Sequence, residues 1–351
     1  GDGLPVRMTA ERFMDKGGLR PWSGVYRSFR TVRGLRVPFE AEVTWQLESG
    51  PFTYAHWLVD SMEYEEDFCP HIQRVVLLRK FGGPEELVVV EQRVPEPQAG
   101  EVLVKVLAAS VQFTDVILRK GRYPDLKDKP PVILGYDVVG EVVRLGPGVT
   151  SISAGQRVAD LTVTGSYAQY RTLKADRVTP VGATLDPAQV TSLVLSWTTA
   201  YQLLHREARV REGQKILVLG AAGAVGQALV VLGRLAGCVV WAAVRARHES
   251  LVRALGGNFV DSDHSDLALV RAEGFDVVFD GIGEQGFSRA WRAVSTRGHL
   301  SAYGFSAGVQ ANAPMALLGW WFAKLWFWNA FSGARSARFF SVTALRKKHP
   351  E

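Results

Sequence analysis

The sequence predicts an α/β fold in which a doubly wound parallel sheet follows a compact β domain, with an extra antiparallel β segment at the N-terminus. Three observations predict it. An apolar strand, a glycine-rich turn and a helix follow one another directly, and strand and helix patterns alternate through the C-terminal part of the chain. Before them come many short strand patterns separated by Gly and Pro turns. We therefore predict an antiparallel β module of unknown function at 1–68, a β domain at 72–190 and an α/β domain at 191–351.

The N-terminal module consists of strand patterns. Residues 39–48, FEAEVTWQLE, alternate apolar and polar side chains, which predicts a half-buried antiparallel strand. A Ser-Gly-Pro turn follows, and residues 52–59 predict the returning strand. An acidic run at 63–67 indicates a junction with the next region.

The middle region contains short strands of the kind found in closed or nearly closed sheets. Examples lie at 101–110, 138–146 and 156–163, and Gly-Pro-rich turns separate them. Many short strands with frequent turns are typical of a barrel-like β domain.

The stretch 215–226, KILVLGAAGAVG, carries the clearest functional signal. A buried strand leads into Gly220, Gly223 and Gly226, and a helix begins at about Ala224. The first glycine permits a tight turn, the second lets the backbone approach phosphates, and the third lets helix and strand pack closely. The peptide groups of this turn, with the helix dipole behind them, favour an anion. This pattern predicts a Rossmann domain that binds a dinucleotide through Gly220, Ala222, Gly223, Ala224, Val225 and Gly226.

Alternation of strands and helices continues to the end of this domain. Further strands are predicted at 239–244, 258–260, 276–280 and 299–303, with helices at 248–257 and 287–298 among those between them. Such alternation produces a parallel sheet with helices on its faces.

Composition sets the broad class. Hydrophobic residues make up 47% of the chain and charged residues 22%, as in ordinary globular proteins. The net charge of +6 indicates a solvated basic surface rather than a nucleic-acid-binding protein. The 2 cysteines build no disulfide framework, which favours a reducing compartment and a cytoplasmic location.

One segment leaves two interpretations open. Residues 315–331, MALLGWWFAKLWFWNAF, are rich in aromatic side chains, carry Lys324 in the middle and are shorter than the roughly 20 residues of a membrane span. A helix buried against a domain or a partner subunit is favoured. Peripheral contact with a membrane interface is the alternative.

Seven segments recur in the order found in a known enzyme superfamily. They are AASVQFTDVILRKGRYP at 108–124, LGYDVVGEVVRLGPGV at 134–149, SYAQY at 166–170, WTTAYQLL at 197–204, LVLGAAGAVG at 217–226, GFDVVFDGIG at 274–283 and LSAYGFS at 300–306. Over about 72–351 the chain resembles the medium-chain dehydrogenase/reductase superfamily, and most of all its zinc-free quinone oxidoreductase branch. Residues 1–68 resemble the end of an uncharacterised bacterial protein family instead.

The resemblance implies a GroES-like domain beside the Rossmann domain, an active site between them and a homodimer. Where zinc-dependent relatives carry their ligands, this chain has no His or Cys, so no zinc is expected. The resemblance assigns proton donation or polarisation of the substrate to Tyr123, and assigns contact with nicotinamide and substrate to Gln112, where Asn is usual. Asp115 matches the family and either orients neighbouring groups or caps a helix.

The resemblance also places residues around the cofactor. The second Rossmann strand ends without an acid and is followed by Arg245 and Arg247, which favours NADPH over NADH. The other positions implied to contact the cofactor are Thr198, Thr199, Gly281, Tyr303, Gly304 and Phe305.

These features predict an NADPH-dependent oxidoreductase that reduces a quinone or an α,β-unsaturated carbonyl by hydride transfer. The alternative is a nucleotide-binding structural or membrane-associated protein with weak or no turnover. The family's C-terminal segment, which returns to the GroES-like domain, is not found before Glu351. We expect an open sheet edge there and impaired activity.

Overall fold

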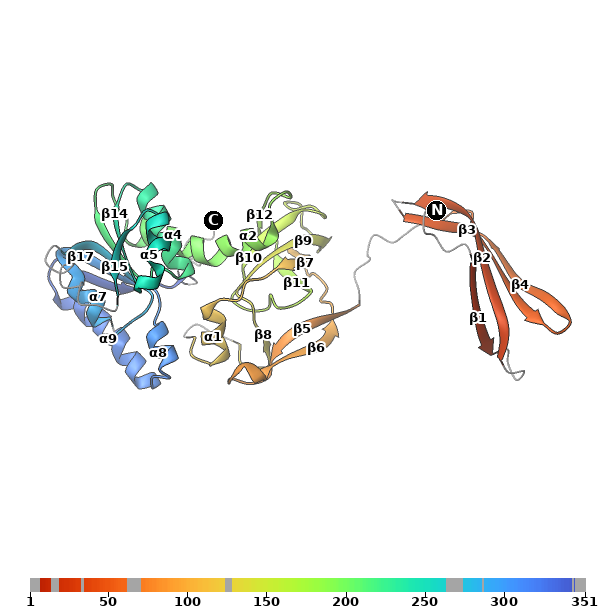
Figure 1. The fold of residues 1–351 in the computed structure, drawn as a ribbon, viewed down its shortest axis with the longest axis horizontal. Helices are drawn as coiled ribbons and strands as arrows, with labels where there is room; N and C mark the ends of the chain where they lie inside the picture. The colour runs from red at the N-terminus through yellow and green to blue at the C-terminus, as the bar shows by residue number, and fades with distance from the viewer. Residues whose placement is uncertain are drawn as a thin grey trace. The chain divides into compact units, whose positions relative to one another are not determined.

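The computed structural model describes residues 7–13, 19–32, 35–61, 71–123, 128–262, 274–285, 287–342 and 344. The chain divides into two compact units, Gly1–Phe68 and Cys69–Glu351. Figure 1 colours the chain from red at the N-terminus to blue at the C-terminus. The predicted acidic junction at 63–67 and the chain end after Ala344 lie outside the described residues.

The first unit is a four-stranded antiparallel sheet in the order β1-β2-β3-β4. Its core contains Trp22, Phe39 and Val43, all nearly inaccessible to solvent. Two of these residues belong to the alternating pattern that predicted the strand. The predicted antiparallel segment is therefore confirmed. The strands are β1 (Arg7–Phe13), β2 (Leu19–Val32), β3 (Leu35–Leu47) and β4 (Gly50–Leu58).

The first part of the second unit is a β domain with two small antiparallel sheets. The sheet orders are β11-β7-β9-β10-β12 and β6-β5-β8. Valine side chains from β7, β9 and β10 form its core, because alternate residues of each strand point inward. Its elements are β5 (Ile72–Leu78), β6 (Leu87–Arg93), β7 (Glu101–Ala108), α1 (Phe113–Arg119), β8 (Val132–Ile133), β9 (Asp137–Leu145), β10 (Arg157–Leu161), β11 (Tyr170–Lys174) and β12 (Thr179–Pro180), with a 3₁₀ turn at Pro84–Glu86.

A helical segment connects this β domain to the parallel sheet. It contains α2 (Pro187–Ser192) and α3 (Thr198–Tyr201), with π-helical turns at Leu193–Trp197 and Gln202–Glu207. Asp186 begins it by accepting a hydrogen bond from the Ala188 N–H at 2.8 Å, as an N-cap does. Wider π turns are frequent where a helix contributes to a functional site.

The last part of the chain is a six-stranded sheet in the order β15-β14-β13-β16-β17-β18, with every pair parallel. Its centre, β13, is buried on both faces, as its unbroken apolar sequence requires. This order confirms the predicted doubly wound sheet. The elements are β13 (Lys215–Leu219), α4 (Ala224–Leu235), β14 (Val239–Val244), α5 (Glu249–Ala254), β15 (Asn258–Asp261), β16 (Phe275–Asp280), α7 (Ser288–Ala293), β17 (Val294–Ala302), α8 (Ser306–Gln310), α9 (Met315–Phe331) and β18 (Ser336–Phe339), with a 3₁₀ turn at Ala246–His248.

One predicted boundary is wrong. The helix expected at 287–298 is α7, which ends at Ala293, and β17 begins at Val294. Val294 pairs with Phe275 of β16. A side chain on Gly298 would come within 2.5 Å of the Phe275 carbonyl oxygen. Because residues 294–298 lie so close to β16, they belong to the sheet, although their sequence pattern predicts a helix.

The aromatic segment forms α9, and one of its sides faces the protein. Leu318 and Leu325 are buried, and Phe322 packs edge-on against Phe339 of β18 with ring centres 4.8 Å apart. Lys324 donates to the Ser288 hydroxyl at 2.7 Å, which accounts for the charge in mid-helix. Trp320, Trp326, Phe327 and Phe331 of the same helix are exposed. No helix in the described ranges is long and apolar enough to cross a bilayer.

Candidate active site

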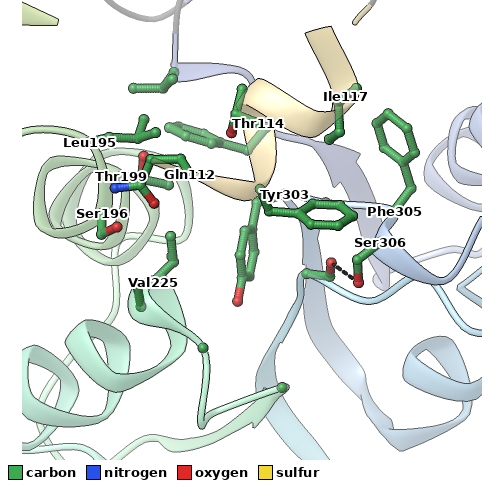
Figure 2. Close-up of a pocket in the computed structure, with 18 of the residues that line it drawn as sticks. Gln112, Thr114, Ile117, Leu195, Ser196, Thr199, Val225, Tyr303, Phe305 and Ser306 are labelled. Atoms are coloured by element: carbon green, nitrogen blue, oxygen red, sulfur yellow. Dashed lines mark hydrogen bonds between the residues drawn. The ribbon is translucent and has the colours of Figure 1, made fainter. Parts of the chain in front are cut away.

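A cavity of about 670 Å³ lies between the β domain and the parallel sheet. Figure 2 shows Thr114 and Ile117 entering from α1, Ser196 and Thr199 from the connecting helical segment, and Val225 from the start of α4. Tyr303, Phe305 and Ser306 follow the end of β17 on another side. The site therefore lies at the carboxyl ends of parallel strands, where open α/β sheets bind ligands.

The glycine turn between β13 and α4 forms one wall of this cavity. Gly220 has φ of +72°, a conformation that residues with a side chain adopt only under strain. A side chain on Gly226 would come within 2.5 Å of the Gly220 carbonyl oxygen and 2.7 Å of the Ala221 Cα. Gly223 has only the Gly220 oxygen nearby, at 3.3 Å. The first and third glycines thus permit the fold, and the second leaves the start of α4 open to the cavity.

A second cavity of about 290 Å³ lies on the other side of the turn. The two cavities share Leu219, Gly220, Gly223, Ile282 and Ser306. The remaining lining residues include Ala222, Arg245, Arg247, His248, Ser262, Glu284 and Arg289. Arg289 contacts the Glu284 carboxylate and the Ser262 carbonyl oxygen. Two cavities joined at a glycine turn fit an elongated ligand with a group at each end, and the arginines of the second cavity suit an anionic group there.

Thr199 provides a second indication that a ligand belongs here. Its hydroxyl oxygen is buried and has no hydrogen-bond partner among the described residues, and Thr199 lines the first cavity. A buried hydroxyl without a partner is costly and calls for a ligand or a water. The neighbouring Thr198 is exposed and is absent from both linings. The residues present therefore fit a nicotinamide dinucleotide, and of the two threonines only Thr199 lines the cavity.

The loop before α1 carries a connected set of polar groups. The Gln112 side-chain amide donates to the Ser110 hydroxyl at 2.8 Å, and that hydroxyl donates to Asp137 at 2.6 Å. Asp115 accepts from the Gln112 N–H at 2.9 Å and from the Gly135 N–H at 3.3 Å. Gln112 lines the first cavity, whereas Asp115 lines neither cavity. Asp115 thus holds the loop that presents Gln112.

Burial raises the pKa values of the buried carboxyl groups near the cavity. It raises the pKa of Asp115 to about 6, although hydrogen bonds from the Gln112 and Gly135 peptide groups oppose the shift. Burial also raises the pKa of Asp137, against the hydrogen bonds from Ser110. A third buried acid, Asp280, accepts from the Ile282 and Gly283 N–H groups at 2.8 and 3.0 Å, and burial raises its pKa to about 6.

Two tyrosines meet on the cavity wall. The hydroxyl groups of Tyr123 and Tyr136 lie 2.6 Å apart, and either can be the donor. Their rings pack edge to face with centres 6.0 Å apart. Tyr136 is 1% exposed, whereas Tyr123 is half-buried. The buried ring fixes the position of its partner's hydroxyl.

The loops after β16 and β17 pack tightly against each other. A side chain on Gly281 would meet the Tyr303 ring at 2.7 Å, and one on Gly304 would meet the Gly281 oxygen at 2.5 Å. Ser306 donates to that same oxygen at 3.3 Å. Burial, with a smaller contribution from the charge of Asp280, raises the pKa of Tyr303. Phe305 packs edge-on against Phe322, which brings α9 to the cavity.

The structure brings together most of the residues that the sequence suggested. Tyr123, Gln112, Thr199, the glycine turn, both arginines and the 303–305 segment line one cavity or the other, and Asp115 and Thr198 line neither. Sequence reasoning missed Tyr136, although it lies in one of the quoted motifs. It also missed an aromatic wall, of which only Phe322 lies in the aromatic segment 315–331. These missed residues are Phe113, Phe322, Phe339 and Phe340.

No group of three or more His, Cys, Asp or Glu side chains that could hold a metal occurs in the described part of the chain. The acids nearest the cavity point to peptide N–H groups and to Ser110. The expectation that the reaction needs no zinc stays a prediction.

Comparisons with known proteins agree with this architecture. Residues 98–183 match the alcohol dehydrogenase GroES-like domain family, and residues 1–57 match a family of unknown function, DUF6544. The chain is 31% identical over 244 residues to a 2-haloacrylate reductase of a Burkholderia species, covering 66% of this chain and 73% of that protein. It is 32% identical over 251 residues to the quinone oxidoreductase of Rattus norvegicus, covering 69% and 76%.

A solved structure extends the likeness to the fold. A mycobacterial protein complexed with NADPH has a TM-score of 0.66 and 26% identity, covering 78% of this chain and 83% of that chain. With the ordered motifs, the parallel sheet and the glycine turn, these relatives identify the chain as a member of the medium-chain dehydrogenase/reductase superfamily of oxidoreductases, in its zinc-free quinone oxidoreductase-like branch.

Proposed function

We propose that this protein is a zinc-independent reductase that uses NADPH to reduce a quinone or an α,β-unsaturated carbonyl compound. The observation that carries the proposal is the composition of a single cavity. The glycine turn of the parallel sheet forms one of its walls, and Tyr123 and Gln112 of the β domain form another. Cofactor and substrate groups would thus share one enclosed space, as hydride transfer requires.

The residues that would hold NADPH lie along both cavities. The glycine turn and the start of α4 would bind the pyrophosphate, and Thr199 would contact the nicotinamide end. Arg245 and Arg247 line the second cavity and would pair with a 2′-phosphate. The bound cofactor supplies the hydride. The NADPH complex of the mycobacterial relative supports this choice of cofactor.

The tyrosine pair supplies the polar chemistry on the substrate side. If Tyr136 donates to Tyr123, the Tyr123 hydroxyl would donate its own proton to a substrate oxygen on which negative charge develops. A hydrogen bond accepted by a developing oxyanion stabilises the transition state more than the ground state. Hydrogen bonds in a chain also polarise one another. The pair therefore acts as one donor with a fixed direction.

Gln112 contributes position rather than a proton. Its amide nitrogen is engaged by Ser110, which Asp137 holds in turn. This fixes the side chain against the cavity, where it would orient substrate and nicotinamide. The family's usual Asn is one methylene shorter than Gln112.

The direct test is oxidation of NADPH, followed at 340 nm, with a panel of quinones and enones. The expected result is turnover with at least one acceptor, together with tighter binding of NADPH than of NADH in fluorescence titrations. Saturable NADPH binding without oxidation by any acceptor would support the alternative, a nucleotide-binding protein without turnover.

Two further features complete the proposal. A cytoplasmic location agrees with Cys238, which is a buried free thiol. A homodimer is implied by the family, and sedimentation equilibrium measures it.

A further inference from the structure

The first cavity has an unusual electrostatic property. None of its described lining residues is Asp, Glu, Lys, Arg or His. Aromatic and aliphatic side chains form most of the wall, and the polar groups are one amide, several hydroxyls and peptide groups. A cavity with such a wall accepts neutral apolar molecules and provides no counter-ion for a charged one.

Three cationic side chains at the end of α1 form hydrogen bonds outside the first cavity. Arg119 is the last residue of α1, and Lys120 and Arg122 follow it. All three line a separate cavity. Arg122 donates to the Ala313 oxygen at 2.9 Å, Lys120 to the Asn312 side-chain oxygen at 3.2 Å, and Arg119 to the Gly82 oxygen at 2.6 Å. These hydrogen bonds hold all three charges away from the first cavity.

The arginines that would bind the cofactor also lie outside the first cavity. Arg245, Arg247 and Arg289 line the second cavity and are absent from the lining of the first. Among the described residues, positive charge is thus available at the end of the site that would receive phosphate, and none lines the end that would receive the substrate.

Two acids hold the loop that forms the Gln112 side of the first cavity. Asp115 and Asp137 both hold the loop that carries Gln112. When ionised they would repel an anionic substrate, and when protonated they would give it no attraction. Against the described wall of this cavity, a carboxylate would lose hydration without gaining an ion pair.

We propose that the substrate is a neutral, apolar carbonyl compound, and that the cavity excludes substrates bearing a carboxylate. This inference rests on the proposed reductase function and narrows it. The chain would therefore differ from its Burkholderia relative, which is named for a carboxylate substrate, a 2-haloacrylate. The hydroxyl of Tyr123 provides the single donor that a neutral carbonyl oxygen needs.

A matched pair of quinones tests the inference. One is a 1,4-naphthoquinone with a propanamide side chain, and the other carries a propanoate of the same size. Two methylenes insulate the ring from the charge, so the intrinsic reactivity of the two rings is nearly equal. We expect kcat/KM with NADPH to be about 100-fold lower for the propanoate, because its charge must be desolvated. Competition binding to the NADPH complex should show the same order.

The possible outcomes separate the two proposals. Equal kcat/KM and equal binding for both quinones would overturn the charge selection while leaving the reductase function standing. Oxidation of NADPH by neither quinone, nor by any other acceptor of the panel, would overturn the reductase function and this inference with it.

A variant tests the electrostatic cause. Ala344 is exposed and lines the first cavity, so Ala344→Lys adds a cation at its edge without disturbing the core. We expect the propanoate-to-amide ratio of kcat/KM to rise about tenfold in Ala344→Lys. Ala344→Gln adds similar bulk without charge and should leave the ratio unchanged. An unchanged ratio in Ala344→Lys would contradict the charge selection.

Discussion

The hydroxyl groups of Tyr123 and Tyr136, 2.6 Å apart, show how a single residue gains its role from a partner that the sequence does not indicate. Tyr123 was predicted from its loop motif. Tyr136 follows Gly135, whose φ of +105° no residue with a side chain adopts easily. A side chain on Gly135 would also meet the Tyr167 backbone at 2.7 Å. The strand entry thus sends Tyr136 inward, a consequence of packing that only the structure reveals.

The first residue-scale prediction concerns this pair. Tyr123→Phe should lower the single-turnover rate of quinone reduction by about 10²–10³, because one donor to the developing charge is lost. Tyr136→Phe should lower it about tenfold, because Tyr123 keeps its hydroxyl but loses its fixed direction. NADPH affinity should stay near wild type in both variants. Stopped-flow absorbance, NADPH titration and melting temperature are measured together. Unchanged turnover in folded Tyr123→Phe would remove this residue from the mechanism.

A second residue-scale prediction concerns cofactor choice. Arg245→Ala and Arg247→Ala should each weaken NADPH binding about tenfold and leave NADH binding nearly unchanged, since only NADPH carries the 2′-phosphate. Arg253→Ala is the matched control, because Arg253 pairs with Glu249 on α5 and lines neither cavity. Fluorescence titration with both cofactors gives the affinities. Equal losses for NADPH and NADH would contradict the assignment.

At the scale of elements, α1 is a short helix whose first turn belongs to the site. Asp115 lies in that turn, is 4% exposed, and accepts peptide hydrogen bonds from both Gln112 and Gly135. The sequence left open whether Asp115 orients neighbouring groups or caps the helix. Asp115 does both. The hydrogen bond that it accepts from the Gln112 N–H caps the N-terminus of α1 and also fixes the residue whose side chain lines the cavity.

Asp115 should make stability depend on pH. Its pKa is raised from 3.8 to about 6 in the folded protein. The folded state therefore holds this proton more tightly than the unfolded state, so the stabilisation is complete below about pH 4 and is lost as pH rises through 6. Relative to Asp115→Asn, the wild-type free energy of unfolding should fall by about 2 kcal/mol from pH 4 to pH 7. Urea unfolding at several pH values measures it. If the free energy of unfolding has the same pH dependence in both proteins, Asp115 does not have a raised pKa in the folded state.

Periodicity predicted the central elements and failed where contacts with a neighbour decided the structure. The unbroken apolar run of β13 and the glycine spacing before α4 were sufficient to predict a strand, a turn and a helix. At Val294 the helical pattern continued, yet pairing with β16 produced a strand. Composition drew attention to α9, but not to Phe322 reaching the cavity, because that contact depends on β18 and Phe305.

At the scale of the whole molecule, the chain combines two units with separate cores. The unit of residues 1–68 has its own sheet, whose strands pair only with one another among the described residues. The match to a family of unknown function lies in this unit, and the GroES-like match lies in the other. Every described residue that lines the first or second cavity falls between Gln112 and Ala344.

We therefore predict that residues 1–68 are dispensable for cofactor binding. A protein of residues 69–351 keeps both cavities, the glycine turn and Arg245, and it loses no described hydrogen bond of the site. Its Kd for NADPH should stay within about twofold of the full chain, a difference of about 0.4 kcal/mol. Fluorescence titration gives the Kd, and far-UV circular dichroism with a thermal melt establishes that the shortened protein is folded. The Arg245→Ala substitution in the shortened protein serves as a control, because it should weaken NADPH binding there as much as in the full chain. A tenfold or greater loss of affinity in a folded 69–351 protein would show that the N-terminal sheet contributes to the nucleotide site, and would contradict the division of the chain into two independent units.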